Sequence, residues 1–223
     1  MRGPKIPPSF RSHSLAVTRT FAAPTMKRTG LLFILLLSLL AAAPVALAKP
    51  TIIIDAGHGG HDRGGVPGQR YSEKLYALDV AKRVQARLKS AGFKTVMTRS
   101  GDYFVGLRQR CDIANRTRGA VFVSVHFNSA KREGANGIET YYYGRKSGSL
   151  AAAVHKRMVR AAGTEDRRVR QRGFYVLRNT KTTAILCECG FLTNGVEGRR
   201  VASSATHRQK LADSIADGVI AVY

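Results

Sequence analysis

The sequence predicts a single α/β domain with a mostly parallel, twisted sheet that is flanked by helices on both faces. Short β-branched and apolar runs alternate along the chain with longer segments whose apolar residues recur every three or four positions. Two of the short runs, residues 51–55 and 121–125, are apolar without alternation, which is typical of strands buried on both faces of a parallel sheet. Such sheets place their sites at the carboxyl ends of the strands, so the residues that follow each strand are the first candidates for function.

The expected elements alternate between strand and helix. The run at 51–55 leads into glycine-rich sequence, as a strand does before a turn. The helix expected over 72–90 carries apolar residues on one face and Lys and Arg on the other, with Ser72 as its N-cap and Gly92 as its stop. The segment between Tyr143 and Phe174 is expected to hold one helix and a basic turn. Further strands are expected at 94–98, 121–125, 138–143, 174–177 and 184–188, and further helices at 107–116, near 150–161 and near 211–222.

The first 48 residues are predicted to lie outside this domain. A basic stretch that starts at Met26 is followed by the apolar run LLFILLLSLL and by Ala46-Leu47-Ala48, whose small residues suit a signal peptidase. Residues 1–48 are therefore interpreted as an N-terminal extension and signal peptide, with Met26 as the true start, and residues 49–223 as the folded domain. Export places this domain in the periplasm, the cell envelope or the medium, without stable membrane insertion after cleavage. A retained anchor is the alternative, because the apolar run with its alanine tail is near the lower length limit of a membrane span.

The folded domain is strongly basic. Residues 1–48 contain six of the 37 Lys and Arg residues and none of the 14 Asp and Glu residues, which leaves 31 basic and 14 acidic side chains and a net charge of +17. Such a charge favours a polyanionic partner, either an anionic cell wall or a nucleic acid. Export favours the wall, and aromatic residues are not interleaved with basic ones as in proteins that stack bases, so no nucleic-acid partner is expected. A solvated basic surface without a specific partner is the plainer alternative.

The three cysteines are Cys111, Cys187 and Cys189. An odd number leaves at least one thiol unpaired within the monomer. Cys187 and Cys189 lie two positions apart in an expected strand, where their side chains share one face and are poorly placed for a bond between them. All three are therefore expected to be small core residues.

Two histidines and two glutamates stand at the ends of expected elements. His58 follows the first strand, and Glu73 begins the first helix. His126 ends the third strand, and Glu188 ends the last strand, so all four are expected at one edge of the sheet. Two imidazoles and one carboxylate are a usual ligand set for catalytic zinc, which lowers the pKa of a bound water to about 7. A second, unbound carboxylate can take a proton from that water and return it to a leaving amine. The four residues therefore predict metal-assisted amide hydrolysis.

Each of these residues also has a structural interpretation. His58 can be a surface or capping residue, Glu73 can favour the helix dipole, and His126 can be a hydrogen-bonded core histidine. Glu188 is harder to explain in this way, because a carboxylate that ends an apolar strand is costly to bury without a partner. The sequence contains no HExxH helix, complete GxGxxG fingerprint, P-loop or GxSxG elbow. These absences exclude the corresponding protease, nucleotide-binding and serine-hydrolase motifs.

Five segments match one family in order, spacing and residue type. They are Ile54 to Gly60, Glu73-Lys74, Thr98-Arg99 with Asp102 and Leu107, Phe122 to Asn128, and Glu188 to Asn194. On these segments, residues 51–223 resemble the zinc-dependent N-acetylmuramoyl-L-alanine amidases of the Amidase_3 family. The resemblance implies that residues 49–223 form a zinc amidase domain, in which His58, Glu73 and His126 hold Zn2+ and Glu188 is the catalytic carboxylate. It also implies peptidoglycan as the substrate, cut at the amide between N-acetylmuramic acid and L-alanine of the stem peptide.

The chain departs from the family pattern at a few positions. His61 stands where other residues are usual and competes with His58 for the metal, although His58 is preferred because it adjoins the strand end. The stretch 63–68 and Thr193 also differ from the usual pattern. No inhibitory helical insertion and no separate wall-binding module are expected, so the basic surface is the candidate for holding the substrate. The rival hypotheses are a zinc peptidase that cuts within the stem peptide and a non-catalytic wall-binding relative, and the sequence specifies no protein activator.

Overall fold

The computed structural model describes Gly3, Thr20 and residues 48–132 and 134–223. The expected extension, signal peptide and start at Met26 lie outside these residues, apart from the few positions just named. The division of the chain at residue 48 therefore stays a prediction. In the part of the chain that is described, none of the helices has the length and apolar character needed to cross a membrane.

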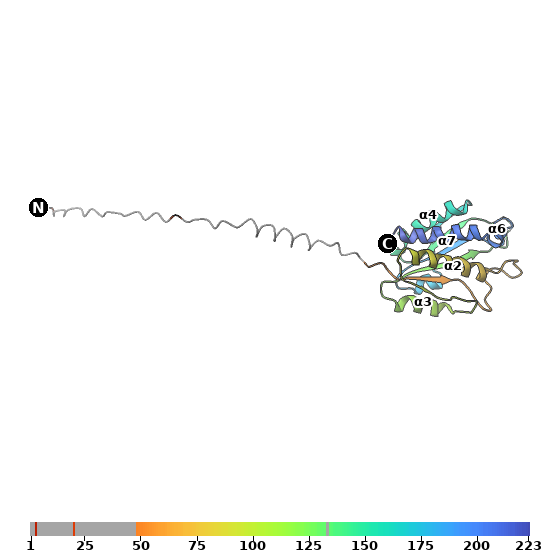
Figure 1. Ribbon diagram of the computed structural model, residues 1–223, viewed down its shortest axis with the longest axis horizontal. Coiled ribbons are helices and arrows are strands. Elements are labelled where there is room, and N and C mark those ends of the chain that lie inside the picture. The colour runs from red at the N-terminus through yellow and green to blue at the C-terminus, as the bar shows by residue number, and fades with distance from the viewer. Residues whose placement is uncertain (1–2, 4–19, 21–47, 133) are drawn as a thin grey trace. The chain divides into compact units, whose positions relative to one another are not determined.

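A six-stranded sheet forms the centre of the domain (Figure 1). Its strands are β1 (Ile52–Ala56), β2 (Thr95–Met97), β3 (Val121–Asn128), β4 (Ile138–Tyr142), β5 (Asp166–Gln171) and β6 (Thr183–Phe191). They lie in the order β2-β1-β3-β6-β4-β5. Every neighbouring pair is parallel except β4 and β6, which are antiparallel. The predicted fold class, an α/β domain with a mostly parallel sheet, is therefore confirmed.

Helices cover both faces of the sheet. They are α2 (Glu73–Ser90), α3 (Leu107–Arg116), α4 (Gly148–Ala162), α5 (Tyr175–Asn179), α6 (Glu197–Ser203) and α7 (Ala205–Ile220), with the 3-10 turn η1 (Arg145–Ser147) before α4. Helices α2 and α4 both pack against α7, and Figure 1 shows α3 on the other side of the sheet from these three. Helix α5 packs with α3, so the sheet lies between a layer of long helices and a layer of shorter ones.

The alternation of side chains along the strands separates two cores. On β1, Ile52 and Ile54 belong to the larger core, beneath α2, α4 and α7, and Ile53 belongs to the smaller core, beneath α3 and α5. Both faces are buried, which explains why this strand is apolar without alternation. Phe122 of β3 lies in the smaller core. By the period of two, His126 lies on the same side of the sheet, four residues further along β3.

Two expectations for the second half of the chain are wrong. The segment expected as a strand at 174–177 forms α5, because Val176 and Leu177 are both buried in the smaller core. Successive side chains of a strand point to opposite faces, so a strand cannot bury both there. The basic segment expected as a turn forms β5, which pairs only with β4. Its arginines suit an edge strand, since charged side chains hinder pairing with other chains.

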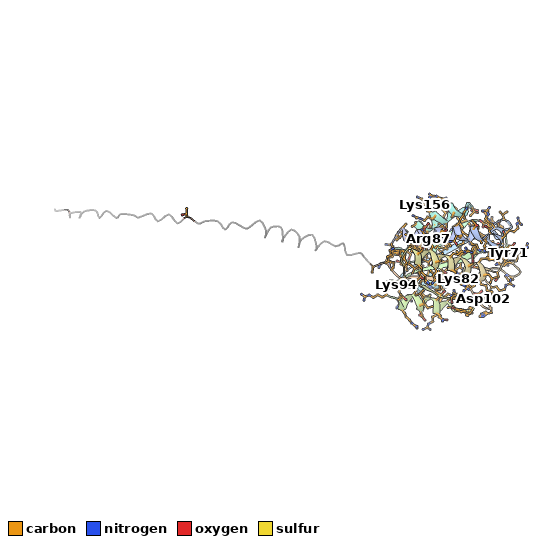
Figure 2. The ribbon with its side chains drawn as sticks, viewed as in Figure 1. Tyr71, Lys82, Arg87, Lys94, Asp102 and Lys156 are labelled. Carbon is orange, nitrogen blue, oxygen red and sulfur yellow. The ribbon has the colours of Figure 1, made fainter. Side chains whose placement is uncertain are left out.

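The cysteines and the outer surface agree with the sequence pattern. Cys111, Cys187 and Cys189 are buried free thiols, which confirms their prediction as small core residues. Charged side chains cover the solvent side of the long helices, and Figure 2 shows Lys82 of α2 and Lys156 of α4 on this surface. The apolar faces of these helices therefore pack against the sheet, while their charged faces contact solvent.

Candidate active site

Three of the predicted site residues converge beyond the carboxyl ends of β1 and β3. Nε2 of His58 lies 3.0 Å from Oε2 of Glu73, and Nδ1 of His126 lies 2.8 Å from Oε1 of the same carboxylate. Ligand atoms of all three residues lie within 4.8 Å of one another. The two imidazole rings are edge to face, with centroids 4.9 Å apart. The loop after β1, the first turn of α2 and the end of β3 thus supply one cluster of two nitrogen donors and a carboxylate.

The loop after β1 allows unusually close packing against His126. Gly57 is the first residue of this loop, and a Cβ atom there would lie 2.3 Å from Cε1 of His126. His58 follows with a φ of 60°, a left-handed conformation that costs a non-glycine residue about 1 kcal/mol or more. A strained residue of this kind persists only when its surroundings hold it in place.

Glu73 is a buried anion at the start of α2. Its side chain is almost fully buried, and the backbone N–H of Phe127 donates to Oε1 at 3.0 Å. Burial alone raises the pKa of this carboxyl, but the hydrogen bonds and charges of His126 and His58 outweigh burial and lower the pKa to about 2. The carboxylate is therefore ionised at neutral pH, which is the form that binds a metal.

Asp62 orients the His58 ring. Nδ1 of His58 lies 2.8 Å from Oδ2 of Asp62, whose Oδ1 accepts a hydrogen bond from the Gly64 N–H at 3.0 Å. Donation from Nδ1–H leaves Nε2, which faces Glu73, as the free nitrogen of the neutral ring. Burial lowers the pKa of His58, but the hydrogen bonds and charges of Glu73 and Asp62 raise it overall. A carboxylate behind an imidazole is the usual support of a metal-binding histidine.

Two arginines tether the backbone of this loop. Nη1 of Arg110 donates to Oδ1 of Asp55 at 2.7 Å and to the carbonyl of Ala56 at 2.6 Å. Nη2 of the same guanidinium donates to the carbonyl of His58 at 2.7 Å. Arg99 donates to the same Ala56 carbonyl at 2.9 Å and to the carbonyl of Gly57 at 2.7 Å. These bonds hold the loop in the conformation that presents His58.

Asp55 fixes Arg110 from within the sheet. It is fully buried near the end of β1, where the hydroxyls of Ser124 and Thr98 each donate to it at 2.7 Å. Burial raises the pKa of Asp55, but the Arg110 charge and the two hydroxyl donors lower it overall. The ionised carboxylate is therefore the stable form, and it anchors the guanidinium that holds the loop of His58.

Glu188 stands beside this cluster, and its buried oxygen has no hydrogen-bond partner among the described residues. It is the register partner of His126 on the parallel strand β3 and of Glu139 on the antiparallel strand β4, so the three side chains share one face of the sheet. Oε2 of Glu188 is buried and accepts no hydrogen bond from the described residues. Burial, reinforced by the negative charges of Glu73 and Glu139, raises the pKa of Glu188 well above its usual range. A carboxyl group whose pKa is raised by burial and neighbouring negative charge holds a proton more readily than an ordinary glutamate and is a candidate for proton transfer.

Glu139 is saturated with partners. Asn128 and Tyr141 donate to its Oε2 at 2.6 and 2.8 Å, and the guanidinium groups of Arg167 and Arg170 lie 3.3 and 3.7 Å from its Oε1. The two neighbouring carboxylates therefore have different surroundings. Glu139 has two hydrogen-bond donors and two nearby guanidinium groups, whereas Oε2 of Glu188 has no partner among the described residues.

Three further residues, His61, Asp62 and Arg110, lie near the cluster. His61 is exposed and stacks near Phe104, with ring centroids 4.3 Å apart, so His58 rather than His61 joins the cluster. Sequence patterns did not reveal the roles of Asp62 and Arg110. The available signals are that Asp62 follows His58 by four residues in a glycine-rich loop, and that Arg110 lies on the buried face of α3.

An apolar cavity adjoins the cluster. It has a volume of about 390 Å³ and is bounded by His58 and His126 on one side and by Phe104, Phe174 and Tyr175 on the other. A cavity with mostly apolar walls and a few convergent polar groups is the usual form of a small-molecule or substrate site.

A comparison with protein families identifies the chain. The model of the Amidase_3 family, described as N-acetylmuramoyl-L-alanine amidase, matches residues 52–221. The chain belongs to this family. Its enzyme class is accordingly that of the N-acetylmuramoyl-L-alanine amidases, as the resemblance in the sequence implied.

Known relatives of this amidase cover its domain. It is 37% identical over 177 residues to the uncharacterized protein YqiI of Bacillus subtilis, with 78% of this chain and 84% of YqiI covered. It is 35% identical to the N-acetylmuramoyl-L-alanine amidase LytC of the same organism, again over 78% of this chain but over only 35% of LytC. It is 34% identical to the probable cell wall amidase LytH of Staphylococcus aureus, over 58% of that protein. The chain thus spans about a third of LytC and less than two thirds of LytH.

Solved amidase structures share the fold. The catalytic domain of CwlV, an N-acetylmuramoyl-L-alanine amidase from Bacillus (Paenibacillus) polymyxa var. colistinus, is 36% identical and superposes with a TM-score of 0.74, over 78% of this chain and 98% of that one. The N-acetylmuramoyl-L-alanine amidase AmiC2 of Nostoc punctiforme is 37% identical, with a TM-score of 0.73 over 78% of this chain and 97% of that one.

Proposed function

We propose that this amidase is a zinc-dependent peptidoglycan hydrolase in which His58, Glu73 and His126 hold Zn2+ and Glu188 transfers protons. The observation that carries this proposal is the convergence of the three donors beside a carboxylate oxygen that has no partner among the described residues. The reaction is hydrolysis of the amide that joins the lactyl group of N-acetylmuramic acid to L-alanine of the stem peptide.

The residues fit a zinc ion. Zinc in catalytic sites takes two histidines and a glutamate and keeps a further position open. Neighbouring ligand atoms around a tetrahedral zinc are about 3.3 Å apart, and the contacts of the Glu73 carboxylate with His58 and His126 measure 3.0 and 2.8 Å. These two contacts must open slightly, and the ligand atoms of the cluster, which lie within 4.8 Å of one another, must adjust around the ion. When bound, zinc supplies Lewis-acid polarisation of water and of the amide carbonyl.

The residues of the chain have separate roles in the reaction. Asp62 holds the tautomer of His58, and the Phe127 N–H holds the carboxylate of Glu73. Glu188 accepts a proton as the oxygen of water bonds to the amide carbon. It then delivers that proton to the nitrogen of L-alanine as the carbon–nitrogen bond breaks. The products are a lactyl carboxylate on the glycan and a stem peptide with a free amino group.

Location and partners follow from the same proposal. A relative named as a probable cell wall amidase and the expected signal peptide in residues 1–48 support a domain exported to the cell envelope. Peptidoglycan is the proposed substrate, and the basic surface is proposed to favour contact with the anionic wall. No nucleic-acid partner and no lasting membrane insertion are proposed, and a separate activator is left open.

Release of stem peptides from purified peptidoglycan tests the proposal. Wild type is expected to release peptides that begin with L-alanine, as identified by mass spectrometry, and to stop when a chelator removes zinc and resume when Zn2+ is returned. Glu188→Gln is expected to lower kcat by about 10²- to 10⁴-fold. Glu165→Gln is the matched control, because Glu165 is exposed and is expected to keep full activity.

The rival functions give different products. A peptidase that cuts within the stem peptide leaves L-alanine attached to the glycan. A non-catalytic wall-binding protein sediments with peptidoglycan and releases no peptide with or without Zn2+. Either result contradicts the proposal, and so does a Glu188→Gln variant with wild-type kcat.

A further inference from the structure

We propose that the cleft at the opposite end of the sheet binds the phosphodiester groups of an anionic wall glycopolymer. The cleft has a volume of about 670 Å³ and lies at the amino ends of β3 and β6, where Val121 and Thr183 line it. His126 lies five residues further along β3, which corresponds to about 17 Å of extended strand. The proposed binding site is therefore separate from the amidase site.

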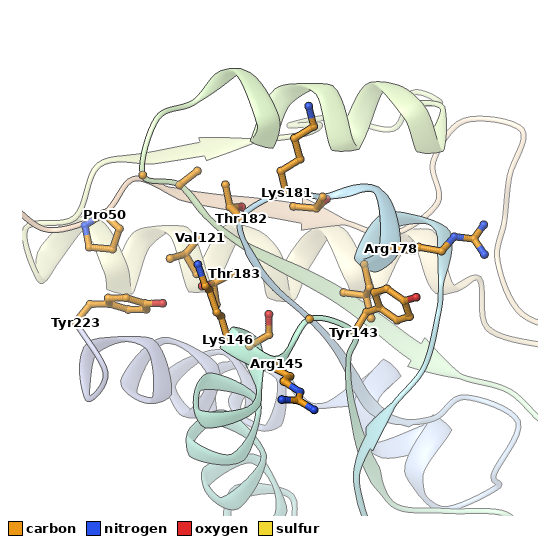
Figure 3. A pocket seen from close by; sticks show the side chains of 16 residues that line it. Pro50, Val121, Tyr143, Arg145, Lys146, Arg178, Lys181, Thr182, Thr183 and Tyr223 are labelled. Atoms are coloured by element: carbon orange, nitrogen blue, oxygen red, sulfur yellow. The ribbon is translucent and has the colours of Figure 1, made fainter.

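Four cations without acceptors surround this cleft. Arg145, Lys146, Arg178 and Lys181 line it, and all four are exposed. Figure 3 shows Arg145, Arg178 and Lys181 extending in different directions around the cleft. None of the four side chains forms an ion pair or hydrogen bond with another residue in 48–132 or 134–223. Such a group of like charges raises the local concentration of anions.

Two threonine hydroxyls supply the second, independent observation. Oγ1 of Thr180 and Oγ1 of Thr182 are buried and have no hydrogen-bond partner among the described residues, and both threonines line the cleft. Burying a hydroxyl without a partner is unfavourable, so such groups are rare without a reason. A phosphate oxygen that enters the cleft accepts hydrogen bonds from them when these side chains rotate toward it. Positive charge and unsatisfied donors thus point to the same kind of ligand.

The size and the setting of the cleft favour a polymer. The cleft is much larger than a single phosphate, and its cations are distributed around it rather than gathered at one point. The exposed rings of Tyr143 and Tyr223 also line it, and such rings can pack against the carbon skeleton between phosphates. The choice of a wall polymer among phosphate-bearing chains rests on the proposed function, which places the enzyme in the envelope.

Binding of purified poly(glycerol phosphate) tests the inference. The cleft variant replaces the four cations named above with glutamine. A surface variant removes the same number of charges by replacing four lysines elsewhere with glutamine. These lysines are exposed and have no ion pair among the described residues: Lys82, Lys89, Lys156 and Lys210. The cleft variant is expected to lose at least about tenfold in affinity and the surface variant at most about threefold. For wild type, the slope of log K against log salt is expected to be about −2 to −3, because several phosphates release counterions.

The threonines separate a built site from a general charge effect. The double variant Thr180→Val and Thr182→Val keeps every charge and is expected to bind about three- to tenfold more weakly, with an unchanged salt slope. It should be at least as resistant to denaturant as wild type, because replacing a buried hydroxyl that has no partner among the described residues removes an unfavourable burial. Equal losses in the cleft and surface variants, or unchanged affinity in the threonine variant, overturn the proposal.

Other ligands are separated in the same assay. Inorganic phosphate is expected to compete only weakly. If vesicles of phosphatidylglycerol bind through the cleft and the polymer does not, the site belongs to a lipid surface and the proposal is wrong. Stem-peptide release from phosphate-free peptidoglycan should be the same for wild type and the cleft variant. If only the cleft variant loses stem-peptide release, the two sites are not separate and the proposal is wrong. If wild type itself releases no stem peptide, the proposed amidase function is wrong, whereas the polymer-binding result still stands.

Discussion

The buried arginine behind the loop of His58 offers a sharp test of how the proposed zinc site is supported. Arg110→Met keeps the length of the side chain and removes its charge and donors. Three of the lost hydrogen bonds reach Asp55, Ala56 and His58, and a fourth, at 2.9 Å, reaches the carbonyl of Val105. The variant therefore leaves a buried carboxylate without its cation and frees the backbone that presents His58.

The expected cost follows from these contacts. Removing one partner of a buried ion pair destabilises a protein by about 3–5 kcal/mol. Ser124 and Thr98 still donate to Asp55, which places the expected loss near the lower limit, about 3 kcal/mol in the free energy of unfolding at pH 7. Because Arg99 still holds part of the loop, zinc affinity is expected to fall by only about tenfold.

Urea unfolding and chelator competition measure the two effects. Asp55→Asn and the double variant complete the cycle, and the double variant should lose at least about 1 kcal/mol less than the sum of the single losses, because neither charge is then left alone. The pH dependence has a definite sign. The pKa of Asp55 is lowered in the folded state, so its stabilising effect is full above the unfolded value near 4 and is lost as the pH falls further. The advantage of wild type over Asp55→Asn should therefore shrink in acid.

Three results refute this reasoning. The first is a loss of less than about 1 kcal/mol in Arg110→Met, which is no more than an ordinary hydrogen bond contributes. The second is strict additivity in the cycle, which means that the pair is not coupled. The third is an unchanged zinc affinity, which means that the guanidinium does not hold the loop in its binding conformation.

Three further perturbations test other supports of the domain. Asp62→Asn should weaken zinc binding about 10- to 100-fold by chelator competition, and an unchanged affinity contradicts its orienting role. Gly64→Ala should abolish most zinc binding and activity, because φ is 70° and a Cβ would lie 2.5 Å from Oε2 of Glu73. Gly68→Ala has a similar φ of 78° but open space, so equal losses in both would implicate backbone strain alone. Glu197 accepts hydrogen bonds from two backbone N–H groups and a threonine hydroxyl. Glu197→Gln should therefore cost about 1–3 kcal/mol in urea unfolding with unchanged kcat, and an unchanged midpoint contradicts this role.

The strands of the central sheet could be predicted because one local signal determines them. A strand buried on both faces is mainly apolar at successive positions, and the first three residues of β1 and of β3 meet that demand. The site could be anticipated for the same reason, since parallel strands end at one edge and carry His58 and His126 to the same place. The local sequence pattern could not predict which residue each buried polar group contacts. The contact between Asp55 and Arg110 joins residues 55 positions apart, and no periodicity encodes it.

The errors in the second half of the chain have a physical cause as well. The aromatic and β-branched residues at 174–177 favour a strand by propensity. Burial decided otherwise, because two successive side chains, Val176 and Leu177, fill the smaller core beside α3. In β5 the error is reversed, since an arginine-rich segment has little apolar pattern to reveal a strand. Its position at the edge of the sheet makes apolar residues unnecessary.

The contrast between two neighbouring carboxylates explains how the sheet can hold a reactive group. Glu139 and Glu188 are register partners on β4 and β6 and share one face, so two like charges there oppose each other. Arg167, Arg170 and two neutral donors stabilise the charge of Glu139. Nothing among the described residues does the same for the buried oxygen of Glu188, and the Glu139 charge further raises its pKa. The edge strand β5 supplies both arginines, so its basic character, besides protecting an edge, gives one carboxylate two cationic neighbours, whereas the pKa of Glu188 is raised.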